Sequence, residues 1–279
     1  MLIRCWGARG SIPVSGREYL KYGGDTTCIE VVAASGETVI VDAGTGIRSV
    51  GNRMLLEGRL ECTMLFTHSH WDHILGFPFF KPIYHHNAKI SVHGCPLAQG
   101  NMETLLAKTM APPYFPVPFK DIAANVSYEP ACLEEICVGS LNISSIALNH
   151  PNMGLGYRFE EEGRVFVFLT DNELGQHHRG GRNFEEYVAF CAGAQLLLHD
   201  AEYDEDDYTR TKGWGHSLYS DAVELALAAG VERFGLFHHN QDRDDHGMDC
   251  MVAKCKSLLG ARNSTLDCFA VQQGEEYSL

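Results

Sequence analysis

Residues 67–73 read Thr-His-Ser-His-Trp-Asp-His, which gathers side chains that bind metal ions in one short segment. The segment follows an apolar stretch, and side chains two residues apart in an extended chain point the same way. His68 and His70 can therefore converge on one ion. After a turn, Asp72 and His73 can reach a second ion nearby. Imidazole and carboxylate groups suit Zn²⁺, iron or Mn²⁺, so this segment predicts metal chemistry.

The surrounding sequence predicts the elements that must position these side chains. Short apolar runs rich in Val, Ile and Phe are typical of buried strands, and apolar residues at helical spacing predict helices. The predicted strands are Cys28–Ala33, Thr38–Val41, Thr63–Phe66, Lys89–Val92, Leu141–Ala147, Arg164–Leu169, Gln195–Leu198 and Phe234–Phe237. The predicted helices are Gly46–Leu56, Leu97–Met110, Asn183–Cys191, Ser217–Ala229 and Met248–Leu259. Strands dominate the first half while helices interleave throughout, which indicates two sheets covered by helices.

Composition excludes some functions. The 279 residues include 22 Lys and Arg against 36 Asp and Glu, a formal charge of −14. This charge argues against coating long nucleic acid, but bound cations can still attract a small anion. No apolar leader and no run of the ~20 apolar residues of a membrane span occurs, so we expect a cytoplasmic protein with no membrane partner. The ten scattered cysteines are expected to be reduced and mostly buried.

The HxHxDH pattern at His68–His73 resembles the metallo-β-lactamase superfamily of hydrolases. Motifs in the family's order extend the resemblance from residue 1 to about residue 245. They are Asp42 after Val39-Ile40-Val41, His150 in Asn149-His150-Pro151, Asp171 after Leu169-Thr170, and His238 after Leu236-Phe237. The resemblance implies a single domain over residues 1–279 with the α/β fold of that family, a four-layer αββα sandwich.

The resemblance also implies two divalent metal ions, which we expect to be zinc, with manganese or iron as alternatives. The implied ligands are His68, His70 and His150 for one ion, Asp72, His73 and His238 for the other, and Asp171 as a bridge. A shared carboxylate offsets the repulsion between two nearby cations. Asp42 is expected either to support a ligand histidine from behind or to cap a turn. His239 replaces His238 as the ligand if the register slips, because neighbouring side chains of a strand face opposite ways.

Two further stretches are similar to motifs of the tRNase Z-like phosphodiesterase branch. His199–Tyr203 contains Asp200, and Gly213–Ser217 contains His216. In that branch an acidic residue orients a histidine near the scissile phosphate, so Asp200 and His216 are the implied catalytic pair. A carboxylate on one imidazole nitrogen fixes the tautomer and raises the basicity of the other nitrogen. Ser217 is a further candidate donor to an anion.

The predicted reaction is hydrolysis of a small, cyclic phosphodiester or nucleotide by a metal-bound hydroxide that Asp72 helps to orient. A small anionic substrate is favoured over long nucleic acid because the chain is acidic and shows no long inserted arm between Trp71 and Asn149. The alternatives are a thioester or lactone hydrolase of the same superfamily and a tRNA-processing endoribonuclease. A non-catalytic metal-binding protein is a further alternative. The resemblance leaves a homodimer open.

Several other stretches are assigned no role in the predicted reaction, and two of them, Ala111–Phe119 and Arg9, have two interpretations. Ala111–Phe119 is rich in proline and aromatic residues, and is either a packed surface loop or a flap beside the active site. Arg9 either contacts phosphate or forms a structural ion pair. The acidic run Glu202–Asp207 is expected to be a solvated loop. His85, His86, His177 and His178 match no ligand motif and are expected at the surface or behind the ligands.

Overall fold

The computed structural model describes residues 1–279 except 96–99, 131 and 133–134. Its strands form two sheets of mixed direction. The first has the order β14 (Glu276–Ser278), β1 (Leu2–Gly7), β2 (Cys28–Val32), β3 (Thr38–Val41), β4 (Glu61–Leu65), β5 (Lys89–Gly94), β6 (Asn125–Pro130). The second has the order β13 (Asp267–Ala270), β12 (Arg233–Phe237), β11 (Leu196–Asp200), β10 (Arg164–Leu169), β9 (Leu155–Glu161), β8 (Leu141–Ala147), β7 (Ile136–Val138).

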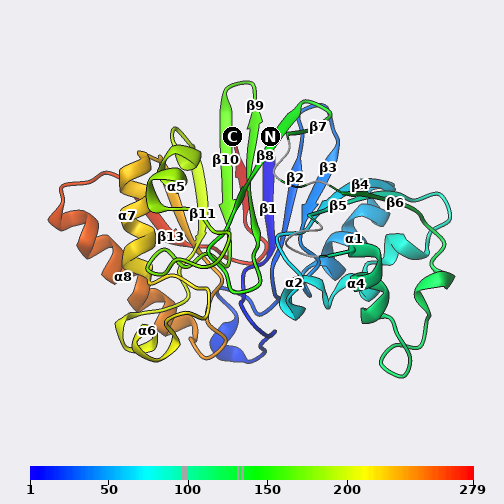
Figure 1. Ribbon diagram of the computed structural model, residues 1–279, viewed down its shortest axis with the longest axis horizontal. Helices are drawn as coiled ribbons and strands as arrows, with labels where there is room; N and C mark the ends of the chain where they lie inside the picture. Colours follow the sequence, from blue (N-terminus) through cyan, green and yellow to red (C-terminus); the bar gives the residue numbers. More distant parts are fainter. Residues whose placement is uncertain (96–99, 131, 133–134) are drawn as a thin grey trace.

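Helices cover the outer face of each sheet, which gives the expected four-layer αββα sandwich (Figure 1). On the first sheet these are α1 (Ile47–Leu56), α2 (Trp71–Ile74) and α4 (Met102–Thr109). The second sheet is covered by α5 (Phe184–Cys191), α7 (Tyr219–Ala229) and α8 (Asp245–Ala261), while α6 (Glu205–Thr211) lies at one end. None of the helices in the described ranges is both long and apolar enough to cross a membrane.

The sequence of β10 explains why the layers pack in this way. Val165 and Val167 point to the helices on one face, whereas Phe166 and Phe168 point into the core between the sheets. Because both faces are buried from Val165 onward, the strand is apolar from there to its end. Thr38–Val41, Leu141–Ala147 and Arg164–Leu169 have the predicted bounds. The other predicted strands differ by a few residues at their ends.

The predicted helices differ from the observed ones mainly at their starts. Asn183 is the N-cap of α5, where its side chain accepts from the N–H of Glu186 and Glu186 reaches back. The predicted helix Ser217–Ala229 starts at Tyr219, and Met248–Leu259 is the middle of α8. The first residues of the predicted helix Leu97–Met110 lie outside the described residues, and α4 accounts for most of the rest.

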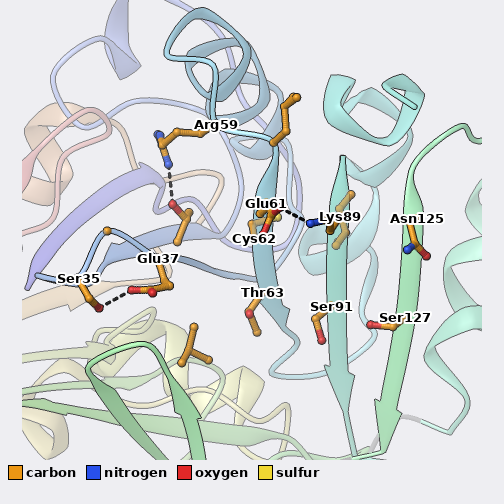
Figure 2. Close-up of a pocket in the computed structure, with 15 residues that line it drawn as sticks. Ser35, Glu37, Arg59, Glu61, Cys62, Thr63, Lys89, Ser91, Asn125 and Ser127 are labelled. Atoms are coloured by element: carbon orange, nitrogen blue, oxygen red, sulfur yellow. Dashed lines mark hydrogen bonds and ion pairs between the residues drawn. The ribbon is translucent and has the colours of Figure 1, made fainter. Parts of the chain in front are cut away.

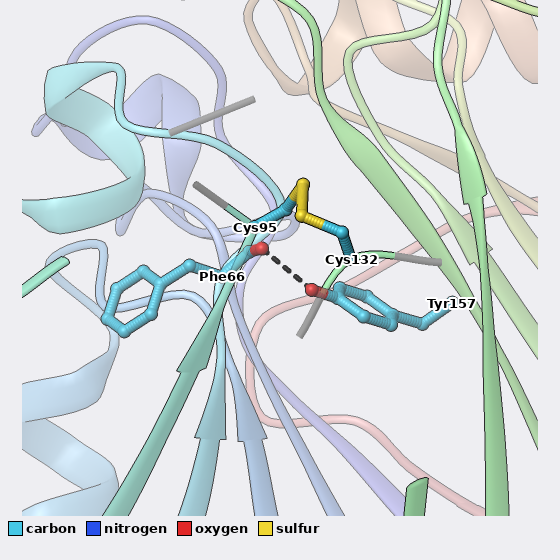
Figure 3. Close-up of a disulfide and its surroundings, with 4 residues drawn as sticks. All are labelled: Phe66, Cys95, Cys132 and Tyr157. Atoms are coloured by element: carbon cyan, nitrogen blue, oxygen red, sulfur yellow. Dashed lines mark hydrogen bonds between the residues drawn. A yellow bond between two sulfur atoms is a disulfide. The ribbon is translucent and has the colours of Figure 1, made fainter. Parts of the chain in front are cut away.

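The prediction that all ten cysteines are reduced is wrong for one pair. Cys95 and Cys132 form a disulfide with their Cα atoms 4.5 Å apart (Figure 3). They follow β5 and β6, two parallel strands that end side by side, and this topology brings together cysteines 37 positions apart. Figure 3 also shows the Tyr157 hydroxyl, which donates to the Phe66 carbonyl across 2.7 Å and so ties β9 to the start of the histidine segment.

Candidate metal centre

The candidate centre lies where several strands end at one edge of the sandwich. In the first sheet β3 and β4 run parallel, and Asp42 and residues 67–73 follow their carboxyl ends. In the second sheet β10, β11 and β12 are parallel, and Asp171, Asp200 and His238 lie at their ends. Carboxyl ends of parallel strands meet at one edge, so two distant halves of the chain supply one cluster.

The structure brings together every residue implied as a metal ligand. His68, His70, His150 and Asp171 have ligand atoms within 4.8 Å of one another. Asp72, His73, Asp171 and His238 form a second group with the same spacing. We call these sets the first and second half-site. Their composition of histidine and aspartate suits divalent transition metals, and Asp171 belongs to both.

Asp171 lies between the half-sites through its two oxygens. Oδ2 is 3.5 Å from His68 Nε2 of the first half-site. Oδ1 is 3.2 Å from His73 Nε2 and 3.4 Å from His238 Nε2 of the second. One carboxylate therefore offers one oxygen to each side, which is the arrangement needed to bridge two cations.

Two buried nitrogen atoms test whether the residues fit metal ions. His68 Nε2 and His73 Nε2 are inaccessible to solvent and make no hydrogen bond of good geometry among the described atoms, although His73 Nε2 lies within ion-pair distance of Asp171 and Asp72. An unpaired buried polar atom costs free energy unless something binds it. Both nitrogens face Asp171, so the donor set fits one cation on each side of that carboxylate.

Acceptors behind the rings hold the histidines with Nε2 facing the centre. His73 Nδ1 is 2.7 Å from Asp42 Oδ2, as expected for a supporting carboxylate. His150 Nδ1 is 3.1 Å from the carbonyl of Gly215. Because a carbonyl or an ionised carboxylate only accepts, Nδ1 carries the proton in each case, and the Nε2 lone pair is left for a metal.

Glu202 is a residue of the site that the sequence analysis missed. The prediction of a solvated loop is wrong for this residue, which is 2% exposed. Its Oε2 lies 2.8 Å from His238 Nδ1, and its Oε1 accepts from Asn240. The prediction also fails for the rest of the run, because Tyr203 is 3% exposed, Asp204 is the N-cap of α6 and residues 205–207 form its first turn, although α6 buries none of its residues. The spacing Asp200-x-Glu202 at a strand end was the available signal, because alternate residues face the same way.

Asp200 and His216 form the expected pair. Asp200 Oδ2 lies 2.7 Å from His216 Nδ1, and its Oδ1 accepts from the N–H groups of Glu202 and Ser217. His216 lies beside the second half-site, with its ring stacked 4.5 Å from His238. The hydroxyl of Ser217 donates to the carbonyl of Asn172, so this hydroxyl does not serve as a free donor to an anion.

Electrostatics divide the histidines of the metal-free protein into two groups. Burial lowers the pKa of His150 to about 3, and burial and the neighbouring His73 hold the pKa of His68 well below its usual value. For His73 and His238 burial acts in the same direction, but nearby carboxylates, Asp171 foremost, raise both pKa values well above the usual one. In the metal-free protein the histidines of the second half-site therefore hold a proton more strongly than those of the first.

The pKa of His216 follows the second pattern. Burial by itself would lower it, but the charges of Glu202 and Asp200 outweigh burial and raise the pKa to about 9. A histidine that holds its proton at neutral pH can donate to a phosphate oxygen or to a leaving alkoxide. His216 is thus suited to act as an acid beside the half-sites.

The backbone is strained at three positions of the site. Asp42, Asp171 and His238 have positive φ angles of 63°, 55° and 59°, which non-glycine residues seldom adopt. Each follows the end of a strand, where the turn aims its side chain into the centre. Gly10 passes so close to His238 that a Cβ would lie 2.3 Å from its ring. Such strain persists only where the surroundings enforce it, and it marks functional sites.

His238 and His239 take different places. His238 faces the half-sites, whereas His239 Nε2 contacts the carbonyl of Val271, 2.8 Å away on the other side. Neither interpretation of Arg9 holds, because its buried guanidinium donates to the carbonyls of Gly23, Asn240 and Arg243.

Of the remaining candidate segments, the loop Ala111–Phe119 packs on the core, and the four histidines without a ligand motif are half-buried or exposed. Phe115 meets Phe79 edge to face at 5.5 Å, and Phe119 lies 6.3 Å from Phe77, so the loop Ala111–Phe119 packs on the core below α4. This supports the interpretation as a packed loop, from which Tyr114 projects with 84% exposure. His85 and His86 stack on each other. His178 contacts Glu173, and His177 is exposed.

A cavity of about 630 Å³ lies away from this centre, at the amino ends of β3 to β6 (Figure 2). Lys89 pairs with Glu61 at 2.6 Å, and Arg59 pairs with the buried Glu30 and with the Thr38 hydroxyl. The charged groups are thus satisfied within the protein. The strands carry the histidine and aspartate clusters at their opposite ends, so we place the functional site there.

Known proteins share this fold and sequence pattern. A family model described as the beta-lactamase superfamily domain matches residues 37–239. Ribonuclease Z of Haloarcula marismortui is 25% identical over 85% of this chain and 86% of its own length. Among solved structures, human tRNase Z, short form, gives a TM-score of 0.68 with 16% identity over 100% of this chain and 99% of its own. A diphosphatase from the PhnP family gives a TM-score of 0.69 with 17% identity, and the match covers 100% of this chain and 97% of its own.

The sandwich and the edge cluster define a hydrolase of the metallo-β-lactamase class. The chain belongs to the beta-lactamase superfamily, and its similarity to ribonuclease Z agrees with the tRNase Z-like motifs around Asp200 and His216.

Proposed function

We propose that this protein is a metal-dependent phosphodiesterase whose preferred substrate is a small phosphodiester such as a cyclic nucleotide. The observation that carries the proposal is the pair of Asp200 and His216, 2.7 Å apart and stacked on His238 beside the half-sites. A protonated imidazole at this place matches the negative charge that builds up when a phosphoester is cleaved.

The half-sites would hold two divalent ions, with His68, His70 and His150 on one side, Asp72, His73 and His238 on the other, and Asp171 shared. We expect zinc. Bound there, two such ions supply an acidified water as nucleophile and neutralise charge on the phosphoryl group.

The chain's own residues supply the other steps. Asp42 and Glu202 fix the tautomers of His73 and His238, so that each presents Nε2 to the centre. Asp72 accepts from the N–H of Ser11 at 2.9 Å, which fixes the carboxylate that we expect to orient the nucleophile. Asp200 holds the His216 ring, and His216 Nε2 donates its proton to the departing oxygen.

A small substrate is supported by charge. The chain carries a formal charge of −14, and a surface of this sign repels a long polyanion beyond the reach of the bound cations. The second candidate is an endoribonuclease acting on tRNA, which the likeness to ribonuclease Z over most of both chains favours. Substrate size is what separates the two.

A hydrolysis screen with zinc-loaded protein tests the proposal. We expect turnover of bis(p-nitrophenyl) phosphate and of a 2′,3′-cyclic nucleotide, weak cleavage of a precursor tRNA, and no hydrolysis of a thioester or a lactone. Efficient tRNA cleavage would replace the small-substrate proposal by the second candidate. Turnover of the thioester or lactone alone would overturn both.

A further inference from the structure

The segment Gly213-Trp214-Gly215, called here the Trp214 loop, lies directly before His216. Trp214 is 63% exposed although indole is among the most apolar side chains. Of the three tryptophans, only Trp71 and Trp214 are largely exposed; Trp71 lies between His70 and Asp72, and Trp214 lies two residues before His216. A large apolar side chain that is exposed close to a site is a candidate for binding a ligand.

A buried carboxylate anchors this loop on both sides of Trp214. Glu173 is fully buried, and its Oε1 accepts from the N–H of Gly213 at 2.7 Å. Its Oε2 accepts from the N–H of Gly215 at 2.9 Å. Tyr208 and His178 complete its contacts at 2.9 and 2.7 Å. The indole is therefore exposed on a fixed backbone and does not belong to a loose surface turn.

The Trp214 loop also touches the candidate centre. The carbonyl of Gly215 is the acceptor that orients His150. The contact is so close that a Cβ on Gly215, whose φ is +99°, would lie 2.0 Å from His150 Nδ1. Gly215, the residue after Trp214, contacts His150 of the first half-site. The next residue, His216, lies beside the second half-site.

We propose that Trp214 is a specificity-determining residue that stacks on a planar ring of the substrate, and that Glu173 is the positioning residue that holds it there. This inference rests on the proposed phosphodiesterase function and names its substrate class as phosphodiesters that carry a nucleobase. Stacking suits any base, because every base presents a π face. A preordered indole stacks at a low cost in conformational entropy.

Two substrates with the same leaving group test this proposal. Thymidine 5′-(p-nitrophenyl) phosphate carries a base, whereas methyl p-nitrophenyl phosphate carries none. We expect Trp214→Ala to lower kcat/KM for the thymidine ester about 5- to 150-fold, the range of one base stacked on an aromatic ring. The methyl ester should change less than about twofold, and Trp214→Phe should keep most of the preference for thymidine. Leu56→Ala removes a side chain that is 88% exposed on α1 and is the control.

Glu173→Gln tests the positioning role through the same ratio of kcat/KM values. One oxygen becomes an NH₂ group that faces N–H donors, so the Trp214 loop must shift, and the preference for the thymidine ester should fall toward that of Trp214→Ala. Glu161→Gln is the matched control. Glu161 is also a buried carboxylate that accepts from a backbone N–H, at Ala34, but it pairs with the N-terminus.

The outcomes separate this inference from the function on which it rests. If the wild type hydrolyses neither ester, the phosphodiesterase function fails and the inference falls with it. If the wild type is active but Trp214→Ala lowers both esters equally, or neither, the stacking role is wrong. If Trp71→Ala alone removes the preference, the ring binds at the other tryptophan. An unchanged ratio in Glu173→Gln would overturn the positioning role.

Discussion

The two half-sites share Asp171 but are supported in different ways. In the first, His68 and His150 have the Thr67 hydroxyl and the Gly215 carbonyl behind them, both of which are neutral. In the second, His73 and His238 have the carboxylates of Asp42 and Glu202 behind them.

The pKa values of His68 and His150 are lowered by burial, whereas those of His73 and His238 are raised by Asp171 foremost, then by Asp72 and by the carboxylates behind the two rings. A metal ion binds neutral imidazole. The first half-site is ready to bind at neutral pH, whereas the second must first release protons. We therefore expect the first half-site to fill first.

Asp171→Ala should have the largest effect, because it removes the side chain common to both half-sites. We expect metal content to fall from two ions per chain to one or fewer. Phosphodiesterase kcat should drop by more than the ~10⁴-fold upper range of a single acid–base group. Metal analysis after dialysis and steady-state kinetics measure both. A variant with two ions and wild-type turnover would show that Asp171 bridges nothing.

His216→Ala comes next and leaves both half-sites intact. We expect kcat for phosphodiesters to fall by ~10²–10⁴-fold with the metal content unchanged. His216→Asn serves as a second variant that fills the space without acid–base function. If the true substrate were a thioester or lactone, its turnover would hardly change in either variant.

The pH dependence of metal binding separates the two half-sites. Protons on His73 and His238 compete with the second metal ion. If binding displaces about two protons, the affinity for this ion should rise by up to about 100-fold for each pH unit. The first ion should show little dependence above pH 7, because the pKa of His150 is about 3. Calorimetric titration in buffers of different ionisation enthalpy counts the protons. Equal slopes for both ions would contradict the comparison.

Glu202→Gln should have the smallest effect of the four substitutions and conditions considered. It places a neutral group behind His238, as in the first half-site. Loss of a carboxylate behind a ligand histidine costs about 10–100-fold in metal affinity or activity. We expect that loss for the second ion only, together with a weaker pH dependence, because the pKa of His238 loses one of the charges that raise it. Chelator competition measures the two affinities, and Glu161→Gln is the control. A loss shared equally by both ions would argue against separate half-sites.

The sequence predicts the core of the fold because its central strands are buried on both faces. Phe166 and Val167 make β10 unmistakable, since neither side of that strand meets water. The strand β9 is missed because it is no continuous apolar run, although the alternation of Arg158 and Glu160 with buried residues is itself typical of a half-buried strand. The edge strands β6, β7, β13 and β14 are short or polar and give little signal.

The candidate site divides in a similar way. His68, His70, Asp72 and His73 are adjacent in sequence, so their spacing alone indicates a metal. Asp171, Asp200 and His238 lie at strand ends and His216 lies shortly before α7, without the close spacing that indicates a metal, so they are identified only through the family resemblance. Glu202 is not predicted because it stands in a run of acidic residues that is typical of the surface. The Cys95–Cys132 disulfide is not predicted because its two cysteines meet only through the pairing of β5 with β6.

The positive φ angles at Asp42, Asp171 and His238 place this centre in conflict with the protein's own thermal stability. Glycine adopts a left-handed backbone at no steric cost, so Asp171→Gly should destabilise the metal-free protein less than Asp171→Ala. Either substitution leaves the buried His73 and His238 without the carboxylate that faces them. Engineering for thermal stability should therefore leave these strand ends unchanged.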